Sequence, residues 1–216
     1  MKTPFIIGLL LAGLTACGPM QESSRLSGAA EGLFARIGGQ DSLTADAPTA
    51  LTREQIEAQP VELLRVSFID FGVTSVLVQS GGSAGMVTWL GADRRSVTFK
   101  DGLLVATRGL GDDLMGSDID AAIASLNGGG NHLRTLDFLN GLNQIERIQF
   151  TCTTTKEGTE TLTIFEKTYQ TDVLEEVCDS EIGGFKNAYW RDGNGVIWQS
   201  RQFISVGGGY LGYQRL

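Results

Sequence analysis

From residue 62 onward, apolar and polar residues alternate with a period close to two, which is typical of strands that bury one face. Valine, isoleucine, phenylalanine and threonine are frequent in these segments, and glycine, aspartate or paired arginines separate them. The segments are residues 62–69, 74–80, 86–91, 96–102, 103–109, 144–155, 159–170, 172–178, 185–192 and 195–204. About ten short strands at this spacing predict a mainly β chain folded as an antiparallel barrel or sandwich, not a parallel α/β sheet.

One or two short helices accompany the strands in this prediction. Thr52 and Gln55 have the spacing of a capping box, so we expect a helix over residues 52–58 that Pro60 ends. A second helix is expected from Ser117 to residues 127–128, with acidic residues in its first turn, where the helix dipole favours negative charge.

Glycine-rich segments mark the expected turns. A hairpin turn is predicted at Lys100–Gly102, and further turns at residues 81–85, 156–158 and 192–195. The segments "GGGN" and "VGGGY" lack the context of a phosphate-binding loop and are interpreted as ordinary loops. His132, which follows "GGGN", is interpreted as a turn residue.

The first residues have the parts of a secretory signal peptide: Lys2, an apolar stretch too short to cross a bilayer, and small residues before a cleavage site. The sequence Leu14-Thr15-Ala16-Cys17 resembles the lipobox of bacterial lipoproteins, in which cleavage precedes a lipid-modified cysteine. We therefore expect a signal peptide at residues 1–16 and a covalent lipid on Cys17 that anchors the protein to a membrane. The alternative is a secretory signal with these residues at its cleavage site by coincidence.

Gly18 follows the modified cysteine, and by the usual sorting preference of this lipoprotein class it indicates the outer membrane, facing the periplasm. Residues 17–48 are rich in glycine, serine and alanine and are expected to form the lipidated anchor and a flexible tether. Residues 49–216 are then expected to form a single β-rich periplasmic domain.

The chain is acidic, with 17 basic and 25 acidic residues and a net charge of −8. This charge disfavours nucleic acid as a partner and disfavours broad electrostatic adhesion to anionic lipid. With Cys17 acylated, Cys152 and Cys178 remain as a pair in an oxidising compartment, and we expect them to form a disulfide. The alternative, a redox or metal-binding thiol pair, is disfavoured because there is no CxxC spacing and His132 is the one histidine of the chain.

No cofactor, metal ligand or catalytic residue is predicted, and we expect a protein that is not an enzyme. The acidic cluster at residues 112–120 lacks the spacing of a calcium loop, and the chain has no nucleophile elbow beside its single histidine. Paired carboxylates in a cleft, as a polysaccharide-modifying enzyme would need, are neither indicated nor forbidden by the pattern.

Aromatic residues are concentrated near the C-terminus: Tyr189, Trp190, Trp198, Phe203, Tyr210 and Tyr213. Tyr189 and Trp190 are neighbours on one strand, so they point to opposite faces and one of the two is expected in the core. Such rings suit either core packing or the stacking of sugar rings.

Four blocks of the chain together resemble the YjbF family of lipoproteins, which includes the group 4 capsule lipoprotein GfcB. They are "LTREQI", "WLGADRRSVTFKDGLLVATRGLGDDL" (residues 89–114), "RTLD" (residues 134–137) and "NAYWRDGNGVIWQSRQFIS" (residues 187–205). The resemblance implies a half-barrel with few helices and a role in making or exporting extracellular polysaccharide, beside outer-membrane and periplasmic export proteins. The C-terminal "VGGGYLGYQRL" departs from the proline-containing strand of the family, so the resemblance does not predict the last strand or its contacts.

The leading hypothesis is an outer-membrane-anchored accessory of exopolysaccharide or capsule assembly or export. It would dock to partner proteins or hold polymer near an export pore. The residues suggested for contact with glycan or partner are Trp89, Arg108, Tyr189, Trp190 and Trp198. The alternative hypothesis is a lipid or glycolipid carrier that uses the concave face of the half-barrel.

Overall fold

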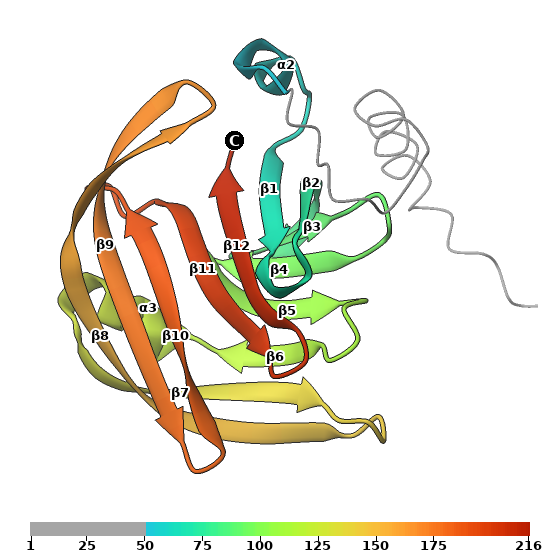
Figure 1. Ribbon diagram of the computed structural model, residues 1–216, viewed down its shortest axis with the longest axis vertical. Coiled ribbons are helices and arrows are strands. Elements are labelled where there is room, and N and C mark those ends of the chain that lie inside the picture. The colour runs from blue at the N-terminus through green and yellow to red at the C-terminus, as the bar shows by residue number, and fades with distance from the viewer. Residues whose placement is uncertain (1–50) are drawn as a thin grey trace, which may run out of the picture.

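The computed structural model describes residues 51–216, which form one twelve-stranded antiparallel sheet curled into a nearly closed barrel shape (Figure 1). The strands are β1 (Leu63–Phe68), β2 (Val73–Ser83), β3 (Met86–Leu90), β4 (Ser96–Lys100), β5 (Leu103–Arg108), β6 (Leu114–Asp118), β7 (Gly130–Leu139), β8 (Ile145–Ile164), β9 (Lys167–Ser180), β10 (Gly183–Arg191), β11 (Ile197–Ser205) and β12 (Gly209–Arg215). The predicted antiparallel, mainly β architecture is confirmed, with twelve strands in place of about ten. Within residues 51–216, no helix is long and apolar enough to span a bilayer.

The strand order is β5-β4-β3-β2-β1-β12-β11-β10-β9-β8-β7-β6, so the sheet is a chain of hairpins joined in its middle by the pairing of β1 with β12. This pairing sets Val66 opposite Tyr213 and settles the question of the last strand. The two outermost strands, β5 and β6, lie next to each other without a ladder between them. Arg108 of β5 bridges this seam by donating hydrogen bonds to the carbonyls of Leu114 and Met115 in β6.

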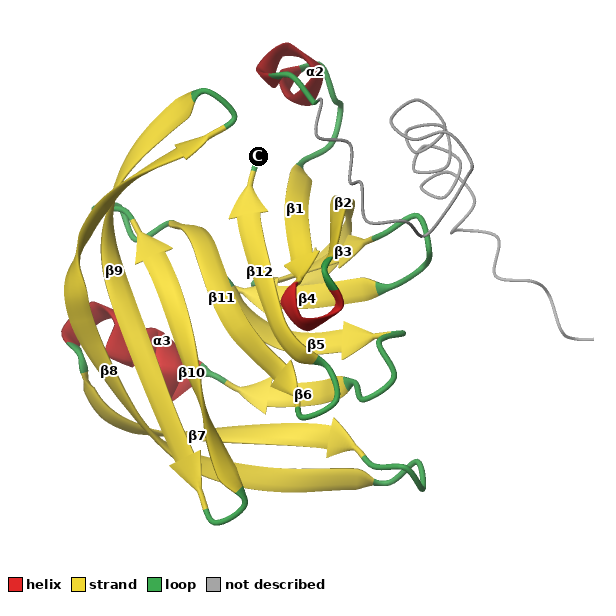
Figure 2. Ribbon diagram, viewed as in Figure 1, coloured by secondary structure: helices red, strands yellow, loops and turns green. Residues whose placement is uncertain are grey.

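Because neighbouring strands are antiparallel, the connections alternate between two ends of the sheet (Figure 2). One end, called here the η1 end, carries the 3₁₀ helix η1 (Ile69–Phe71) and the β3–β4, β5–β6, β7–β8, β9–β10 and β11–β12 loops. The other, called the α3 end, carries helix α3 (Asp120–Gly128) and the β2–β3, β4–β5, β8–β9 and β10–β11 turns. Helix α2 (Arg53–Glu57), which precedes β1, also lies at the α3 end.

The core lies inside the curled sheet, where alternate residues of each strand meet. Val97 and Phe99 of β4 are buried, whereas Ser96, Thr98 and Lys100 are only partly covered. Helix α3 adds Ala122 and Leu126 to the same apolar cluster. This period-two burial is the pattern from which the strands were predicted.

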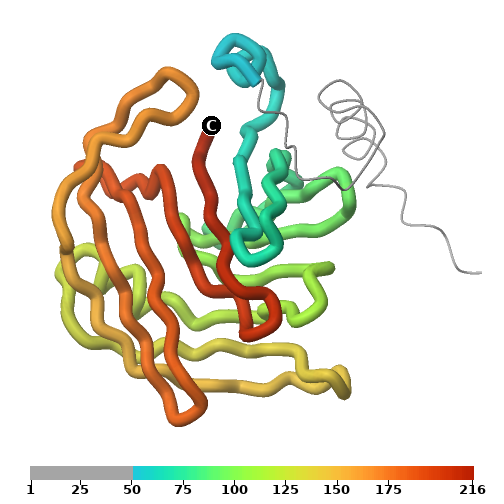
Figure 3. The backbone as a smooth tube through the Cα atoms, in the orientation of Figure 1, coloured from blue at the N-terminus to red at the C-terminus, as the bar shows by residue number. Residues whose placement is uncertain are grey.

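The first predicted helix is confirmed in position and cause. The backbone N–H of Gln55 donates to the Thr52 hydroxyl at 3.2 Å, and the N–H of Thr52 donates to the Gln55 side chain at 2.9 Å, which completes the capping box. Arg53 in this helix donates to the carbonyls of Ile164 and Phe165, so α2 holds the tip of the long β8–β9 hairpin (Figure 3).

The predicted start of the second helix is wrong by three residues. Helix α3 begins at Asp120, because Ser117 and Asp118 still belong to β6 and pair with Leu136 and Thr135 of β7. The pairing of β6 with β7 therefore outweighs the preference of Asp118 for the first turn of a helix.

The predicted turn at Lys156–Gly158 is also wrong. These residues lie inside β8, where the register shifts by one residue in a bulge. The chain reverses instead at Phe165 and Glu166, both of which have positive φ. The turns at Asp101–Gly102 and Asp192–Gly195 are confirmed.

The interpretation of His132 as a turn residue is wrong. His132 lies within β7, opposite Cys152 of β8, in a ladder that begins at Gly130. Only the first two residues of the "GGGN" segment end the helix, and the next two already pair with β8.

Candidate functional site

A cavity of about 390 Å³ lies inside the sheet at the α3 end. Residues of β1, β3, β4, β11 and β12 form one side of it, and residues of α3 form the other. Its size falls within the range of small-molecule sites in proteins, about 300–1,000 Å³.

The inner wall of the cavity is aromatic and aliphatic. Trp89, Phe99 and Tyr213 contribute rings to it, with Phe99 edge-on to Tyr213 at a centroid distance of 4.9 Å. The Tyr213 hydroxyl donates to the carbonyl of Ile197 at 3.1 Å, and burial raises the pKa of this phenol. The hydroxyl therefore stays protonated as a fixed donor.

Gly102 keeps this wall free of another side chain. Its φ of +85° belongs to the left-handed region, and a Cβ there would lie 2.6 Å from the Tyr213 hydroxyl and 2.9 Å from Cβ of Ile197. The turn between β4 and β5 can approach the wall only as glycine.

The rim of the cavity is polar. Arg191 of β10 donates to the Leu126 carbonyl at 2.8 Å and to the Asn127 side chain, so its guanidinium is held against the end of α3. Asp101, which is exposed, also lines the cavity. Further along the rim, Arg215 and Glu62 form an ion pair at 3.7 Å.

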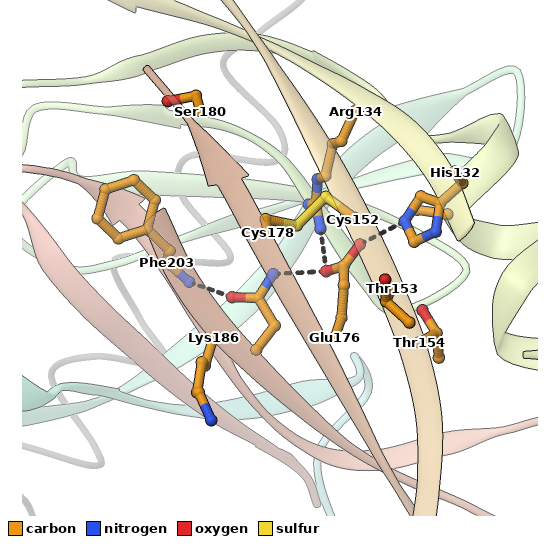
Figure 4. Close-up of a disulfide and its surroundings, with 12 residues drawn as sticks. His132, Arg134, Cys152, Thr153, Thr154, Glu176, Cys178, Ser180, Lys186 and Phe203 are labelled. Carbon is orange, nitrogen blue, oxygen red and sulfur yellow. Dashed lines mark hydrogen bonds and ion pairs between the residues drawn. A yellow bond between two sulfur atoms is a disulfide. The ribbon is translucent and has the colours of Figure 1, made fainter. Parts of the chain in front are cut away.

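A second polar centre is buried between β7, β9 and β10, and Glu176 is its hub (Figure 4). The Glu176 carboxylate binds His132 at 2.9 Å and Arg134 at 2.6 Å. It also accepts hydrogen bonds from Asn187 at 2.7 Å and from the Tyr189 hydroxyl at 2.9 Å. The side-chain oxygen Oδ1 of Asn187 in turn accepts from the backbone N–H of Phe203, which ties β10 to β11.

The protonation states of Glu176 and Tyr189 are set by burial and by the neighbouring side chains. Burial alone would raise the pKa of Glu176, but the positive charge of Arg134 and the hydrogen bonds from His132, Asn187 and Tyr189 outweigh it and lower the pKa to about 2. Burial raises the pKa of Tyr189, and the neighbouring Glu176 charge raises it further. Glu176 is therefore a carboxylate and Tyr189 a neutral phenol at physiological pH.

A disulfide lies beside this centre and joins Cys152 of β8 to Cys178 of β9, which face each other in the ladder (Figure 4). The Cys152 sulfur, a ring nitrogen of His132 and a carboxylate oxygen of Glu176 lie within 4.8 Å of one another. Because the Cys152 sulfur is in the disulfide and Glu176 is bound to Arg134, this group stabilises the fold and offers no set of free metal ligands.

A third feature is a group of exposed apolar side chains at the η1 end, called here the η1-end apolar group. Its members are Ile69 and Phe71 in η1, Leu142 and Ile145 at the β7–β8 loop, Ile182 at the β9–β10 turn and Val206 at the β11–β12 turn. Val206 is 94% exposed and Leu142 is 78% exposed. Among the described residues, Leu133 of β7 is the other large apolar side chain with comparable exposure, at 54%.

The five residues suggested for contact lie in different places. Trp89 lines the cavity, Arg108 bridges the seam, and Tyr189 is fully buried in the Glu176 centre. Trp190 donates to Glu160, and Trp198 stacks on Tyr169 and donates to Asp192. Tyr189 and Trp190 do point to opposite faces, with Tyr189 in the core.

Sequence reasoning missed Glu176, Asn187 and Gln202. Asn187 and Gln202 lie inside the blocks that carry the family resemblance, at inward-facing positions of strands, and polar residues at such positions were the available signal. Glu176 lies in "DVLEEVC", where the period of two sets it on the same face as Cys178.

The predicted signal peptide (residues 1–16), the lipid attachment at Cys17 and the tether (residues 17–48) lie outside the described residues.

The family model described as "Group 4 capsule polysaccharide lipoprotein gfcB, YjbF" matches residues 38–216. The crystal structure of the hypothetical lipoprotein YmcC from Escherichia coli (K12) is similar with a TM-score of 0.70 and 20% sequence identity. The alignment covers 93% of this chain and 97% of the YmcC chain, and it shows a shared fold. A search of curated protein sequences gives no match.

Proposed function

The chain belongs to the YjbF family of group 4 capsule polysaccharide lipoproteins, and from this membership we propose that it is a non-enzymatic accessory of capsule or exopolysaccharide assembly or export. In this proposal residues 49–216 form the working domain in the periplasm, and a lipid on Cys17 holds the protein in the outer membrane. The match of the family model over residues 38–216 is the observation that carries the proposal.

The non-enzymatic part of the proposal is supported by the use of the buried polar side chains. Glu176 is bound by four neighbours in its centre. Asp113 is held by the Thr107 hydroxyl and by the backbone N–H groups of Gly109 and Leu110. Residues that satisfy one another in this way stabilise the fold and have little freedom to act on a substrate.

Docking to a partner protein is the mode of action that the η1-end apolar group supports. Exposed apolar side chains that gather on one end of a molecule are typical of interaction surfaces. Hydrogen bonds tie η1 to the β11–β12 turn, because Asp70 accepts from the backbone N–H of Tyr210, and they tie this turn to the β5–β6 loop, because the Ser205 hydroxyl donates to the Asp112 carbonyl. Ile69, Phe71 and Val206 are therefore presented on two segments that are tied to each other.

The charge beside these residues favours a protein over a lipid surface. Phe71 follows Asp70, Ile145 precedes Glu146, and Ile182 follows Glu181. Carboxylates next to the apolar tips disfavour anionic headgroups and suit a partner surface with an apolar patch and cationic rim. We propose an outer-membrane or periplasmic polysaccharide-export protein as this partner.

Deletion of the gene tests the proposed function. Surface polysaccharide should fall while the intracellular pools of nucleotide sugars stay at or above their normal level, because polymer assembly or export is affected and precursor synthesis is not. Unchanged surface polysaccharide in the deletion strain would contradict the proposal.

A second candidate function, carriage of a lipid or glycolipid, is favoured by the cavity at the α3 end. It predicts that the purified full-length protein retains a stoichiometric lipid, which native mass spectrometry detects. Retention of lipid without any effect of gene deletion on surface polysaccharide would favour this candidate over the first.

A further inference from the structure

The cavity at the α3 end joins an apolar wall to a charged opening, and the two parts are held in place by separate contacts. The wall is fixed by the Tyr213–Ile197 hydrogen bond and by the packing of Phe99 on Tyr213. The opening is fixed by the two hydrogen bonds from Arg191 to the end of α3. A ligand would meet a preformed site, which limits the entropy lost on binding.

Arg191 has hydrogen-bonding capacity left over. A guanidinium carries five N–H donors, and one from each terminal nitrogen is used on Leu126 and Asn127. Within residues 51–216, no carboxylate lies within ion-pair distance of Arg191. Donors therefore remain for an oxygen-rich ligand at the opening.

Trp89 differs from the other two tryptophans because its indole N–H has no acceptor among residues 51–216. Trp190 donates its indole N–H to Glu160, and Trp198 donates to Asp192. The part of the chain that the structure describes supplies no acceptor for the indole N–H of Trp89, which is 6% exposed and lines the cavity. Among residues 51–216, the indole nitrogen of Trp89 is not one of the fully buried polar atoms without a partner, so it can donate to an oxygen of a ligand that enters the cavity.

The combination of groups selects among ligand classes. An acyl chain would cover the wall, but at the opening it would remove water from Arg191 and Asp101 without replacing their hydrogen bonds, which is costly. An inorganic anion would bind Arg191, but it would leave the aromatic wall unused and be repelled by Asp101. A sugar ring has an apolar C–H face for the wall and hydroxyl groups that both donate to Asp101 and accept from Arg191 and Trp89.

We propose that this cavity is a binding site for one glycosyl residue, with its C–H face on the Trp89 side and its hydroxyls at Asp101 and Arg191. The proposal deepens the proposed function and rests on it, because it makes the polysaccharide a direct ligand of the protein. The glycosyl residue can belong to the polymer itself or to the headgroup of a glycolipid, since both present the same chemistry.

The test uses the full-length protein in detergent and oligosaccharides released by mild acid from the surface polysaccharide of the same cells. Saturation-transfer NMR and calorimetry measure the binding. Ile123 lines the cavity from α3, so Ile123→Trp fills the cavity and should abolish binding. Arg191→Gln should weaken binding roughly tenfold or more, as expected for the loss of a charged hydrogen-bond donor.

Two control variants separate the site from general effects. Ala124→Trp places the same side chain on the exposed face of α3, and Arg147→Gln removes an exposed arginine that pairs with Asp137 near the η1 end. Both should bind the oligosaccharides as the unmodified protein does. Equal binding by Ile123→Trp and Ala124→Trp would overturn the proposal, even if Arg191→Gln fails to fold.

The outcomes also separate this proposal from the proposed function. If the oligosaccharides do not bind but gene deletion still lowers surface polysaccharide, the glycosyl site is wrong and the function stands. If they bind at the cavity but deletion has no effect, the site stands and the function is wrong. A glycolipid from the same membranes that competes with the oligosaccharides supports the site, whereas a sugar-free lipid released by Ile123→Trp overturns it.

Discussion

At the scale of single residues, Glu176 of β9 has the most consequences, because two side chains from β7 and two from β10 converge on its carboxylate. Arg134 and Glu176 are about 2% and 1% exposed, and each compensates the charge of the other. Removing one partner of such a buried pair leaves a charge without compensation, which typically costs about 3–5 kcal/mol.

The pKa of Glu176 predicts how stability depends on pH. Its pKa is about 2 in the folded protein, below the ordinary value of 4.5, so its contribution to stability is complete above about pH 5 and is lost as pH falls toward 2. From this difference, we expect about 3 kcal/mol of unfolding free energy to disappear over that range. Denaturant unfolding of the oxidised protein at several pH values measures it.

Glu176→Gln should unfold more easily at pH 7 and should lose less stability on acidification than the unmodified protein. Glu175→Gln is the matched control, since Glu175 is the adjacent residue on the opposite face of β9 and pairs with Lys186 near the surface. An acid dependence that is the same in Glu176→Gln and the unmodified protein would contradict the assigned role.

The sequence made part of this centre predictable. Arg134 stands in the "RTLD" block and Tyr189 in "NAYWRD", so both were singled out by the family resemblance, and the strand period indicated that Tyr189 or Trp190 would be buried. Their common partner Glu176 was not predictable, because the register of β9 against β8 depends on a bulge at Lys156–Gly158 that the pattern alone presents as a turn.

At the scale of elements, Gln202 of β11 joins the outer strand β5 to the middle of the sheet across the interior. Its side chain accepts from the backbone N–H of Leu104 at 2.8 Å and donates to the Gly102 carbonyl at 2.8 Å, both beside the outer strand β5. It also donates to the Ser200 hydroxyl. The Ile-Trp-x-Ser-x-Gln run thus serves to hold β5, which has no ladder on its outer side.

Gln202→Leu should destabilise the protein by about 2–4 kcal/mol, because it leaves buried backbone groups of β5 without partners. Hydrogen–deuterium exchange should become faster at Leu104 and its neighbours than in the rest of the sheet. Gln199→Leu, on the opposite face of β11, is the control and should leave exchange in β5 unchanged. Uniform protection of β5 in both variants would show that the bridge is unimportant.

The disulfide constrains the long β8–β9 hairpin, whose cysteines are 26 residues apart. Replacing both by alanine, Cys152→Ala with Cys178→Ala, should cost about 3–4 kcal/mol if loop entropy in the unfolded chain is the main effect. Thermal unfolding in oxidising buffer measures this loss. With reductant present, the unmodified protein should approach the stability of the double variant, and a difference that persists would point to packing as the main contribution.

Element types were predictable wherever local chemistry decides them, as in the Thr52–Gln55 capping box and the Asp101–Gly102 turn. Boundaries set by pairing partners were not. β7 begins in a glycine-rich stretch because β8 lies beside it, and α3 starts late because Ser117 and Asp118 complete β6.

At the scale of the whole molecule, the curled sheet separates two surfaces with different chemistry. The α3 end holds the cavity and receives the chain from helix α2, and the η1 end presents the apolar group. In our account, the α3 end contacts the polysaccharide and the η1 end contacts the export machinery, so one small protein can link the polysaccharide to the export machinery.

The most direct test of this account is co-purification of the full-length protein from its own membranes after crosslinking, with the recovered proteins identified by mass spectrometry. The unmodified protein and the Leu133→Asp control, which changes an exposed apolar residue of β7, should both recover an outer-membrane or periplasmic polysaccharide-export component. The double variant Phe71→Asp with Val206→Asp, which changes the η1-end apolar group, should lose it and should lower surface polysaccharide. Recovery of the same export component by the double variant, or of none by the unmodified protein, would contradict the account.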